Sequence, residues 1–439
     1  IADVDWVIEA VVENLGVKQQ LMARLEGVLR DDAIVSTNTS GLPIHAIAQG
    51  RSESFRRRFL GTHFFNPPRY LKLLEVIPTT DTAPEVLKRM QWFAELHLGK
   101  GVVVAKDTPN FIANRIGVYA TMLGLRAITE QGYTIEEIDT LTGTIVGRPK
   151  SATFRTADLV GLDTLMYVAD NLYPAIPHDE SREVFRVPQL LRKLVETGTL
   201  GTKTGQGFYK KQGKEILSIN PGTLVYEPAK PMNLGDIEAL HEIHDLKKRL
   251  HILYQLSGRA GDFFRQSTLD LLGYSARRIP EIADSPAEID RAMRWGFGWE
   301  LGPFEIWDAL GFETVLADMK TASIPVPEWV ERMQHQGVGG FYQRDAETRR
   351  GGDAVNSIVS VSPRPKVPAS SSTSVDEINL DIVKADAKHT LWHNSEAALL
   401  DLGDGVVLYE FRSKGNTLSL NVVNGLIEVL DILETSDFR

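Results

Sequence analysis

His63 and Glu75 are the residues whose types and surroundings best suit proton transfer. His63 ends the apolar run Phe59-Leu60-Gly61-Thr62, and Glu75 lies inside the apolar stretch 72–77. An unpaired carboxylate in such a stretch is costly to bury. A carboxylate bonded to an imidazole holds the ring in one tautomer and makes it a better base, so the two residues together predict a general base. The alternatives are a structural histidine and a glutamate that faces water.

Two other polar positions are candidate ligand contacts. The cluster Ser36-Thr37-Asn38-Thr39-Ser40 closes the strand predicted from Ile34. Its hydroxyl and amide groups suit a ligand, but they suit a turn or a helix cap equally well. Asn114 lies in the helix predicted after Pro109, with Thr108 as the expected cap. A mid-helix asparagine is slightly unfavourable, which suggests a role, although solvent exposure explains it too.

An alternation of strands and helices must position these residues. Apolar residues from Val17 to Leu29 have helical spacing, and the predicted strands are Val4–Val12, Ile34–Thr37, Phe59–His63, Leu73–Ile77 and Gly101–Ala105. This alternation is typical of a parallel doubly wound sheet, whose ligands bind beyond the carboxyl ends of the strands. No G-x-G-x-x-G turn comes before the first strand. We therefore expect residues 1–107 to be the C-terminal part of a Rossmann-type dinucleotide-binding domain in a sequence that is truncated at both ends.

Residues 108–345 are predicted to be mostly helical and to contain one unit twice. Glu137-Ile138-Asp139 recurs as Glu288-Ile289-Asp290, and Gly207-Phe208-Tyr209 recurs as Gly340-Phe341-Tyr342. Four residues also recur 150 positions later, namely Phe154, Asp158, Gly161 and Thr164. A repeat of this length indicates duplicated domains rather than solenoid units. We expect the copies at 108–211 and 237–345, with a connector at 212–236.

The last part of the sequence predicts a linker and the start of another domain. Residues 346–375 are rich in Pro and Ser and cannot bury enough apolar surface to order themselves. Two apolar runs joined through Gly403-Asp404-Gly405 predict a hairpin over 399–411, and a helix is expected over 421–433. These elements alone cannot form a core, so we expect residues 376–439 to be a truncated domain.

Composition excludes several classes of function. The net charge of −10 argues against a general nucleic-acid binder. The absence of cysteine excludes disulfides, thiolate metal sites and a cysteine nucleophile, and no metal site is predicted. The absence of cysteine also fits a cytoplasmic location, which is expected. No apolar run approaches the roughly 20 residues that span a bilayer.

Several motifs together resemble those of the L-3-hydroxyacyl-CoA dehydrogenases. They are Val12-Glu13-Asn14, Ser36 to Ser40, His63-Phe64-Phe65-Asn66-Pro67, Leu74-Glu75-Val76, Asp107 to Arg115, and Lys203 to Tyr209. They occur in the family's order over about residues 1–345. The linker and a hydratase-like start at about 395 resemble multifunctional fatty-acid oxidation chains in which the dehydrogenase precedes an enoyl-CoA hydratase. The resemblance implies an α/β plus all-α chain: a partial Rossmann domain, two helical dehydrogenase C-terminal domains and the start of a crotonase-like domain.

The same resemblance implies NAD-dependent oxidation of an L-3-hydroxyacyl-CoA to the 3-ketoacyl-CoA in fatty-acid β-oxidation. His63 would be the base, Glu75 would orient it, Ser40 would bond the reacting oxygen, and Asn114 would hold the substrate near its thioester. The implied NAD contacts are Glu13, Lys18, Ser40, Asn66 and Lys203. Without the glycine-rich segment, the fragment itself is expected to be inactive.

Other readings remain open at this stage. The resemblance implies an acyl-CoA substrate and a thiolase partner, whereas acyl-chain length and oligomeric state are not readable from the sequence. One alternative function is a short-chain 3-hydroxybutyryl-CoA dehydrogenase, which the hydratase-like end of the chain disfavours. Another is a scaffold that keeps the fold without the chemistry. The presence of Ser40, His63, Glu75 and Asn114 together argues against a scaffold.

Overall fold

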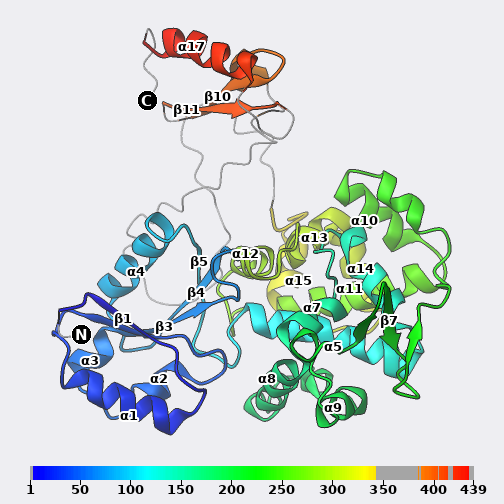
Figure 1. Ribbon diagram of the computed structural model, residues 1–439, viewed down its shortest axis with the longest axis horizontal. Coiled ribbons are helices and arrows are strands. Elements are labelled where there is room, and N and C mark those ends of the chain that lie inside the picture. The colour runs from blue at the N-terminus through cyan, green and yellow to red at the C-terminus, as the bar shows by residue number, and fades with distance from the viewer. Residues whose placement is uncertain (1–2, 343–383, 385–386, 404, 414–418, 435–439) are drawn as a thin grey trace. The chain divides into compact units, whose positions relative to one another are not determined.

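A computed structural model describes residues 3–342, 384, 387–403, 405–413 and 419–434 of the chain. The chain divides into two units, residues 1–361 and 362–439. All of the candidate site residues belong to the first unit, which joins an α/β part to a helical part (Figure 1).

The α/β part is a five-stranded sheet in the order β1-β2-β3-β4-β5. Its strands are β1 (Trp6–Glu9), β2 (Ile34–Thr37), β3 (Phe59–Phe64), β4 (Leu73–Pro78) and β5 (Gly101–Val104). The accompanying helices are α1 (Leu15–Glu26), α2 (Ile44–Ile47), α3 (Glu53–Arg57) and α4 (Pro84–Leu96). Alternate strand residues enter two separate apolar cores: Val35 and Phe59 enter one, and Ile34 and Leu60 enter the other. The central strands are therefore covered on both faces, as a doubly wound sheet requires.

Strand direction follows from the connections. Three of the neighbouring pairs are parallel, as the sequence predicts, whereas β3 and β4 are antiparallel. Parallel neighbours need a crossover that is usually helical, and the residues between β3 and β4 form no helix. The antiparallel register sets His63 directly opposite Glu75.

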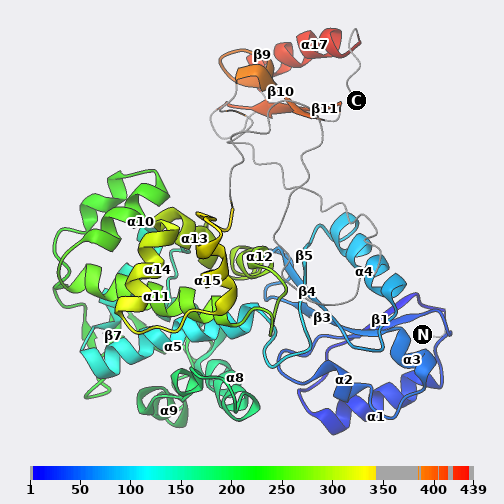
Figure 2. The ribbon, with the colours of Figure 1, turned by 180° about the vertical axis from the view of Figure 1, so that it is seen from behind.

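The helical part is built around α5 (Ala113–Gln131), which packs against α11 (Arg259–Arg277) and α12 (Pro286–Phe297) (Figure 2). The other helices are α6 (Ile135–Leu141), α7 (Phe154–Val160), α8 (Leu162–Ala175), α9 (Gln189–Glu196), α10 (Leu246–Gln255), α13 (Pro303–Leu310), α14 (Phe312–Thr321) and α15 (Glu328–His335). Single-turn 3₁₀ helices are η1 (Thr144–Val146), η2 (Arg182–Phe185), η3 (Thr202–Thr204) and η4 (Glu238–Glu242).

Helix α5 begins later than the sequence predicts. Its first residue is Ala113, so the expected cap at Thr108 is wrong. The backbone of Asn110 and Phe111 is left-handed, with φ values of 63° and 49°, and this interrupts any helix that starts at Pro109. The first amide groups of α5 therefore need partners from elsewhere in the fold.

Strands that the sequence analysis does not predict lie in the connector of 212–236 and just before it. β6 (Tyr209–Gln212), β7 (Glu215–Ile219) and β8 (Tyr226–Pro228) form an antiparallel sheet. Gly213 has a φ of 62° in the tight turn between β6 and β7, a conformation that glycine adopts without strain.

A buried hydrogen-bond network holds the first half of the helical part together. Asp139 accepts hydrogen bonds from the backbone N–H of Phe154 (2.7 Å) and from the Tyr209 hydroxyl (2.9 Å). Asp158 accepts from the N–H groups of Phe208 (2.8 Å) and Tyr209 (2.9 Å). The two carboxylates thereby tie α6, α7 and β6 together.

The second half contains the same network. Asp290 accepts from the N–H of Phe304 (2.9 Å) and the hydroxyl of Tyr342 (2.8 Å), and Asp308 accepts from the N–H of Tyr342 (2.9 Å). These residues are the counterparts that the sequence repeat identifies. The recurrence of their bonds supports the predicted duplication, although its boundaries stay a prediction.

We expect the stability conferred by Asp158 to fall as the pH rises. Burial raises the pKa of its carboxyl to about 6, from 3.8. Between these values the folded state keeps a proton that the unfolded state has released, so raising the pH favours unfolding. The unfolding free energy of the parent minus that of Asp158→Asn should be about 1 kcal/mol smaller at pH 7.5 than at pH 5. Urea denaturation at both pH values measures this difference, and a constant difference would contradict the assignment.

The second unit contains the predicted hairpin and helix. β9 (Thr390–His393), β10 (Ala397–Gly403) and β11 (Val406–Phe411) form an antiparallel sheet, and the 3₁₀ turn η5 (Ala387–His389) and α17 (Leu420–Glu434) flank it. The predicted linker, residues 346–375, lies outside the described residues. The crotonase-like assignment of 376–439 stays a prediction.

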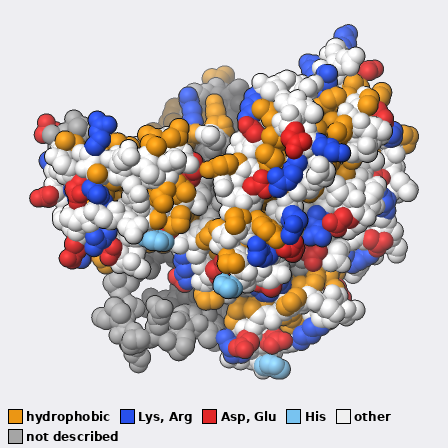
Figure 3. Space-filling view, turned by 90° about the horizontal axis from the view of Figure 1, so that it is seen from below, with side chains coloured by type: hydrophobic (Ala, Val, Ile, Leu, Met, Phe, Trp, Pro, Cys, Tyr) orange, Lys and Arg blue, Asp and Glu red, His pale blue; other side chains and the backbone are white. Residues whose placement is uncertain are grey.

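Surface charge and helix composition bear on the expected partners. On the face shown in Figure 3, Lys and Arg side chains lie among Asp and Glu side chains. None of the helices in the described part of the chain is both long and apolar enough to cross a membrane.

Candidate active site

The predicted contact between His63 and Glu75 is present. His63 lies near the end of β3 and Glu75 opposite it on β4, and their Nδ1 and Oε2 atoms are 2.7 Å apart. Both side chains are buried, at 5% and 0% exposure. The interpretation of Glu75 as a residue that faces water is therefore wrong.

The second carboxylate oxygen of Glu75 caps helix α5. Its Oε1 accepts hydrogen bonds from the backbone N–H groups of Ile112 (3.1 Å) and Ala113 (2.8 Å). These two donors belong to the N-terminus of α5, so Glu75 takes the place of a local capping residue. Because both oxygens of Glu75 act as acceptors, the hydrogen bond to His63 requires a proton on Nδ1. In the neutral ring, Nε2 is then the nitrogen that can accept a proton.

Aromatic rings enclose the imidazole. The centroid of Phe65 lies 4.7 Å from that of His63 in an edge-to-face arrangement, and the centroid of Phe111 lies 5.6 Å away. With 5% of its surface exposed, His63 has little contact with water. The environment suits proton transfer in a water-poor site.

The polar cluster after β2 divides into structural and loop-forming residues. Ser36 accepts a hydrogen bond from the indole of Trp6 (2.9 Å), so its role is structural. Asn38 accepts from the N–H of Phe64 (2.9 Å), which ties the cluster to the residue after His63. Ser40 belongs to the loop that follows and is only partly buried.

Glu13 organises the loop that carries Ser40. Its Oε1 accepts from the N–H groups of Ser40 (3.1 Å) and Gly41 (3.2 Å) and from the hydroxyl of Thr39. The structure thus brings two predicted NAD contacts, Glu13 and Ser40, together beyond the carboxyl ends of β1 and β2. This is the edge where a doubly wound sheet binds its ligand.

Lys18 lies in a buried ion-pair cluster. Its Nζ is 2.8 Å from Glu9 and 3.4 Å from Glu13, and Glu9 also accepts from the hydroxyl of Thr37 (2.5 Å). Sequence reasoning missed Glu9. The criterion that identified Glu75, an acid inside an apolar stretch, also applies to Glu9 in the run Val4 to Val12.

The remaining candidates have different surroundings. Asn114 is the second residue of α5 and is partly buried next to Ala113. Asn66 is exposed in the loop after β3. Lys203 pairs with Asp163 of α8, with Nζ to Oδ1 at 2.5 Å. Among the described residues, no contact joins Asn66 or Lys203 to the other candidates. Their roles stay predictions.

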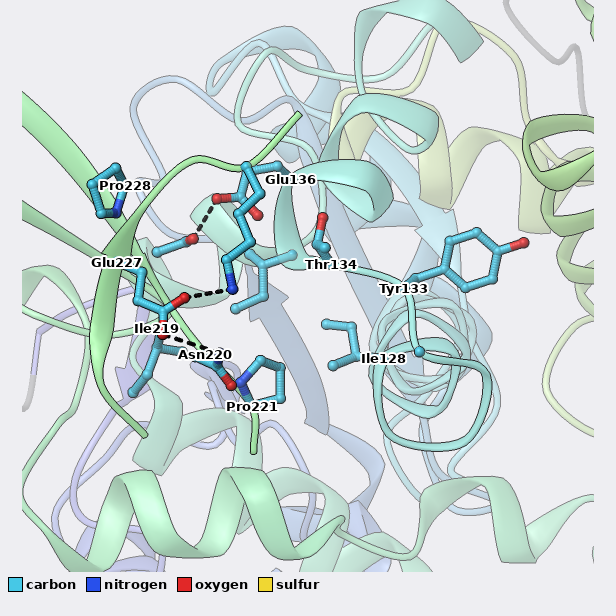
Figure 4. A pocket seen from close by; sticks show the side chains of 13 residues that line it. Ile128, Tyr133, Thr134, Glu136, Ile219, Asn220, Pro221, Glu227 and Pro228 are labelled. Carbon is cyan, nitrogen blue, oxygen red and sulfur yellow. Dashed lines mark hydrogen bonds and ion pairs between the residues drawn. The ribbon is translucent and has the colours of Figure 1, made fainter. Parts of the chain in front are cut away.

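A surface depression of about 250 Å³ lies away from these residues, between the end of α5, the start of α6 and strands β7 and β8 (Figure 4). Its polar groups pair with one another: Ser218 donates to Glu136, and Glu227 pairs with Lys230 at 2.6 Å. Because these groups already have partners, the depression offers a ligand little binding energy.

Two family models match most of the chain. The "3-hydroxyacyl-CoA dehydrogenase, NAD binding domain" model matches residues 1–108. The "3-hydroxyacyl-CoA dehydrogenase, C-terminal domain" model matches residues 111–211 and 271–339. The same C-terminal model therefore matches segments in both halves of the helical part.

Individual relatives agree with the family models. A "Probable 3-hydroxyacyl-CoA dehydrogenase" of Bacillus subtilis is 44% identical over 432 residues, which are 98% of this chain and 53% of that protein. The chain thus spans about half the length of this relative. A Mycobacterium tuberculosis 3-hydroxybutyryl-CoA dehydrogenase is 37% identical over 212 residues, 48% of this chain and 71% of that one.

A solved structure shares the fold. The crystal structure of 3-hydroxybutyryl-CoA dehydrogenase from Escherichia coli superposes with a TM-score of 0.56 at 25% identity, covering 76% of this chain and 79% of that one. Together with the two family models, the likeness extends over both the sheet and the helical part. The chain belongs to the 3-hydroxyacyl-CoA dehydrogenase family.

Proposed function

We propose that this chain carries the catalytic residues for the NAD-dependent interconversion of L-3-hydroxyacyl-CoA and 3-ketoacyl-CoA. The observation that carries the proposal is the buried pair of His63 and Glu75, whose carboxylate also caps α5. A dehydrogenase of this kind needs a base for the substrate hydroxyl and a charge that stabilises the protonated base. The pair supplies both.

The chemistry follows from the free nitrogen of His63. The 3-hydroxyl loses its proton to Nε2 while C3 loses a hydride, so the C–O bond becomes a carbonyl. NAD, when bound, supplies the hydride acceptor. Glu75 stabilises the imidazolium that forms, and its position does not change because Ile112 and Ala113 hold its other oxygen.

The loops beside the pair fit a polar ligand. The side-chain Nδ2 of Asn110 is buried without a hydrogen-bond partner among the described residues. Its Oδ1 lies near Gly41, 3.3 Å from where a Cβ would stand, so Asn110 faces the loop that carries Ser40. Leaving a buried donor unpaired costs about 1–3 kcal/mol, and a ligand acceptor would recover this. Glu13, Ser40 and Lys18 are the residues here that would hold NAD, and Ser40 and Asn114 would position the substrate.

The assay of this function is the loss of NADH absorbance that depends on acetoacetyl-CoA, in the natural protein that carries this sequence. Turnover is expected with acetoacetyl-CoA and with longer 3-ketoacyl-CoA substrates. Comparing kcat/KM across chain lengths distinguishes a β-oxidation enzyme from a short-chain enzyme. The names of the Mycobacterium protein and of the Escherichia structure favour the short-chain enzyme. Absence of turnover with every chain length would contradict the proposal.

We further propose the setting that the resemblance implies. The substrate is an acyl-CoA, the location is cytoplasmic, and the natural partner is a thiolase that consumes the 3-ketoacyl-CoA product. Residues 376–439 would belong to an enoyl-CoA hydratase domain that supplies the hydroxyacyl substrate. Co-purification with thiolase activity tests the partner.

A further inference from the structure

Helix α12 packs so closely on the sheet and on α5 that two glycines are needed opposite it. A Cβ added to Gly101 of β5 would stand 2.3 Å from the ring of Trp295, and one added to Gly117 of α5 would stand 2.1 Å from the ring of Phe297. Figures 1 and 2 both place α12 beside β4 and β5. Helix α12 belongs to the copy predicted over 237–345, here called the second repeat, and this repeat is therefore packed closely against elements that carry the candidate site.

This contact reaches His63 through aromatic rings. The centroid of Phe297 lies 6.1 Å from that of Phe65, and the centroid of Phe65 lies 4.7 Å from that of His63. Both pairs are edge-to-face, an arrangement that restrains ring orientation. The orientation of the imidazole is thus restrained by its hydrogen bond to Glu75 and by its contact with Phe65, which in turn contacts Phe297 of the second repeat.

A second contact reaches Glu75 through α5. Arg115 is fully buried, two residues after the amide of Ala113 that binds Glu75. Its guanidinium donates to the hydroxyl of Tyr274 on α11 (2.6 Å) and to Glu281 (3.1 Å), both in the second repeat. A buried guanidinium with several partners has little freedom to move. The first turn of α5 is therefore held from the second repeat.

We propose that the second repeat positions both members of the His63–Glu75 pair, with Phe297 and Tyr274 as positioning residues. Phe297 acts on His63 through Phe65, and Tyr274 acts on Glu75 through Arg115 and the first turn of α5. The second repeat is thereby a working part of the active site although it supplies no catalytic residue. This inference rests on the proposed function.

The kinetic test compares Phe297→Leu with Phe264→Leu in the natural protein. Phe264 is a buried residue of α11 that packs against Tyr254, so its replacement makes the same change in the same repeat away from the pair. Phe297→Leu should lower kcat for acetoacetyl-CoA reduction about tenfold, since small misplacements of reacting groups are costly. KM for NADH should stay within about twofold, and the primary isotope effect with 4-deuterated NADH should rise as hydride transfer becomes rate-limiting.

The structural test uses Tyr274→Phe, which removes the hydroxyl that accepts from Arg115 (2.6 Å) and donates to Asp179 (2.8 Å). The side chains of Arg115 and Asp179, which are 2.6 Å apart, are themselves unchanged. Amide hydrogen exchange of residues 110–116, followed by mass spectrometry, should accelerate in this variant and stay unchanged in Phe264→Leu. This measurement requires no activity.

The outcomes separate the inference from the proposed function. An inactive parent contradicts the proposed function, and the exchange measurement still tests the positioning. An active parent in which Phe297→Leu and Phe264→Leu have equal kcat values overturns the inference. Unchanged exchange at 110–116 in Tyr274→Phe overturns it as well.

Discussion

Replacing His63 with glutamine is expected to lower kcat by at least ~100-fold, the usual effect of losing a general base. Glutamine keeps the approximate size of the imidazole and can still donate to Glu75, but it has no atom that accepts the hydroxyl proton at the position of Nε2. Because the hydrogen bond of His63 is to Glu75 on β4, the loops that carry Glu13 and Ser40 should stay in place.

Steady-state kinetics of acetoacetyl-CoA reduction and NADH binding by fluorescence measure this effect. The dissociation constant for NADH should be nearly unchanged. A matched control is His97→Gln, since His97 is exposed just after α4 and meets the ring of Trp92 edge to face. Equal kcat values for His63→Gln and the parent would remove His63 from the mechanism.

Replacing Glu75 with glutamine is expected to reduce both turnover and stability. Glu75 accepts three hydrogen bonds, from His63 on one oxygen and from Ile112 and Ala113 on the other. A glutamine has one oxygen and one NH₂ group, so either the imidazole or the first turn of α5 would face a donor instead of an acceptor. The imidazolium also loses its compensating charge.

We expect kcat to fall by about 10- to 100-fold and the free energy of unfolding to fall by roughly 1–3 kcal/mol. Denaturant titration and steady-state kinetics measure the two effects. The control is Glu95→Gln on α4, an exposed glutamate far along the chain from the pair. Parent-like kinetics in Glu75→Gln would show that the carboxylate does not support the base.

The sequence predicted the pair well but not what holds it. His63 at the end of a strand and Glu75 inside an apolar run were recognisable from residue type and hydrophobic context. The helix cap was not, because it depends on left-handed backbone at Asn110 and Phe111, which no local pattern indicates for a phenylalanine. A cap at Thr108 was the better local prediction, and the long-range bond from Glu75 replaced it.

Long-range packing also decided the surroundings of Lys18. Lys18 shares the buried face of α1 with Met22 and Leu25. Its partners Glu9 and Glu13 come from other segments, so only the structure shows that they pair with it. The repeated unit, by contrast, was recognisable from the sequence before any contact was known. Asp139 and Asp290 were matched by sequence alone, and they make matching hydrogen bonds to Phe154 and Phe304.

What the sequence determined by itself was the five strands of the main sheet, the largely helical character of residues 108–345 and the candidates His63 and Glu75, because strand and helix periodicity and an acid in an apolar run are local signals. The tertiary structure decided which oxygen of Glu75 meets which partner, and how the second repeat contacts the sheet through Gly101 and Gly117. These contacts join residues far apart in the chain. They depend on side-chain volume and backbone geometry that only the assembled packing determines.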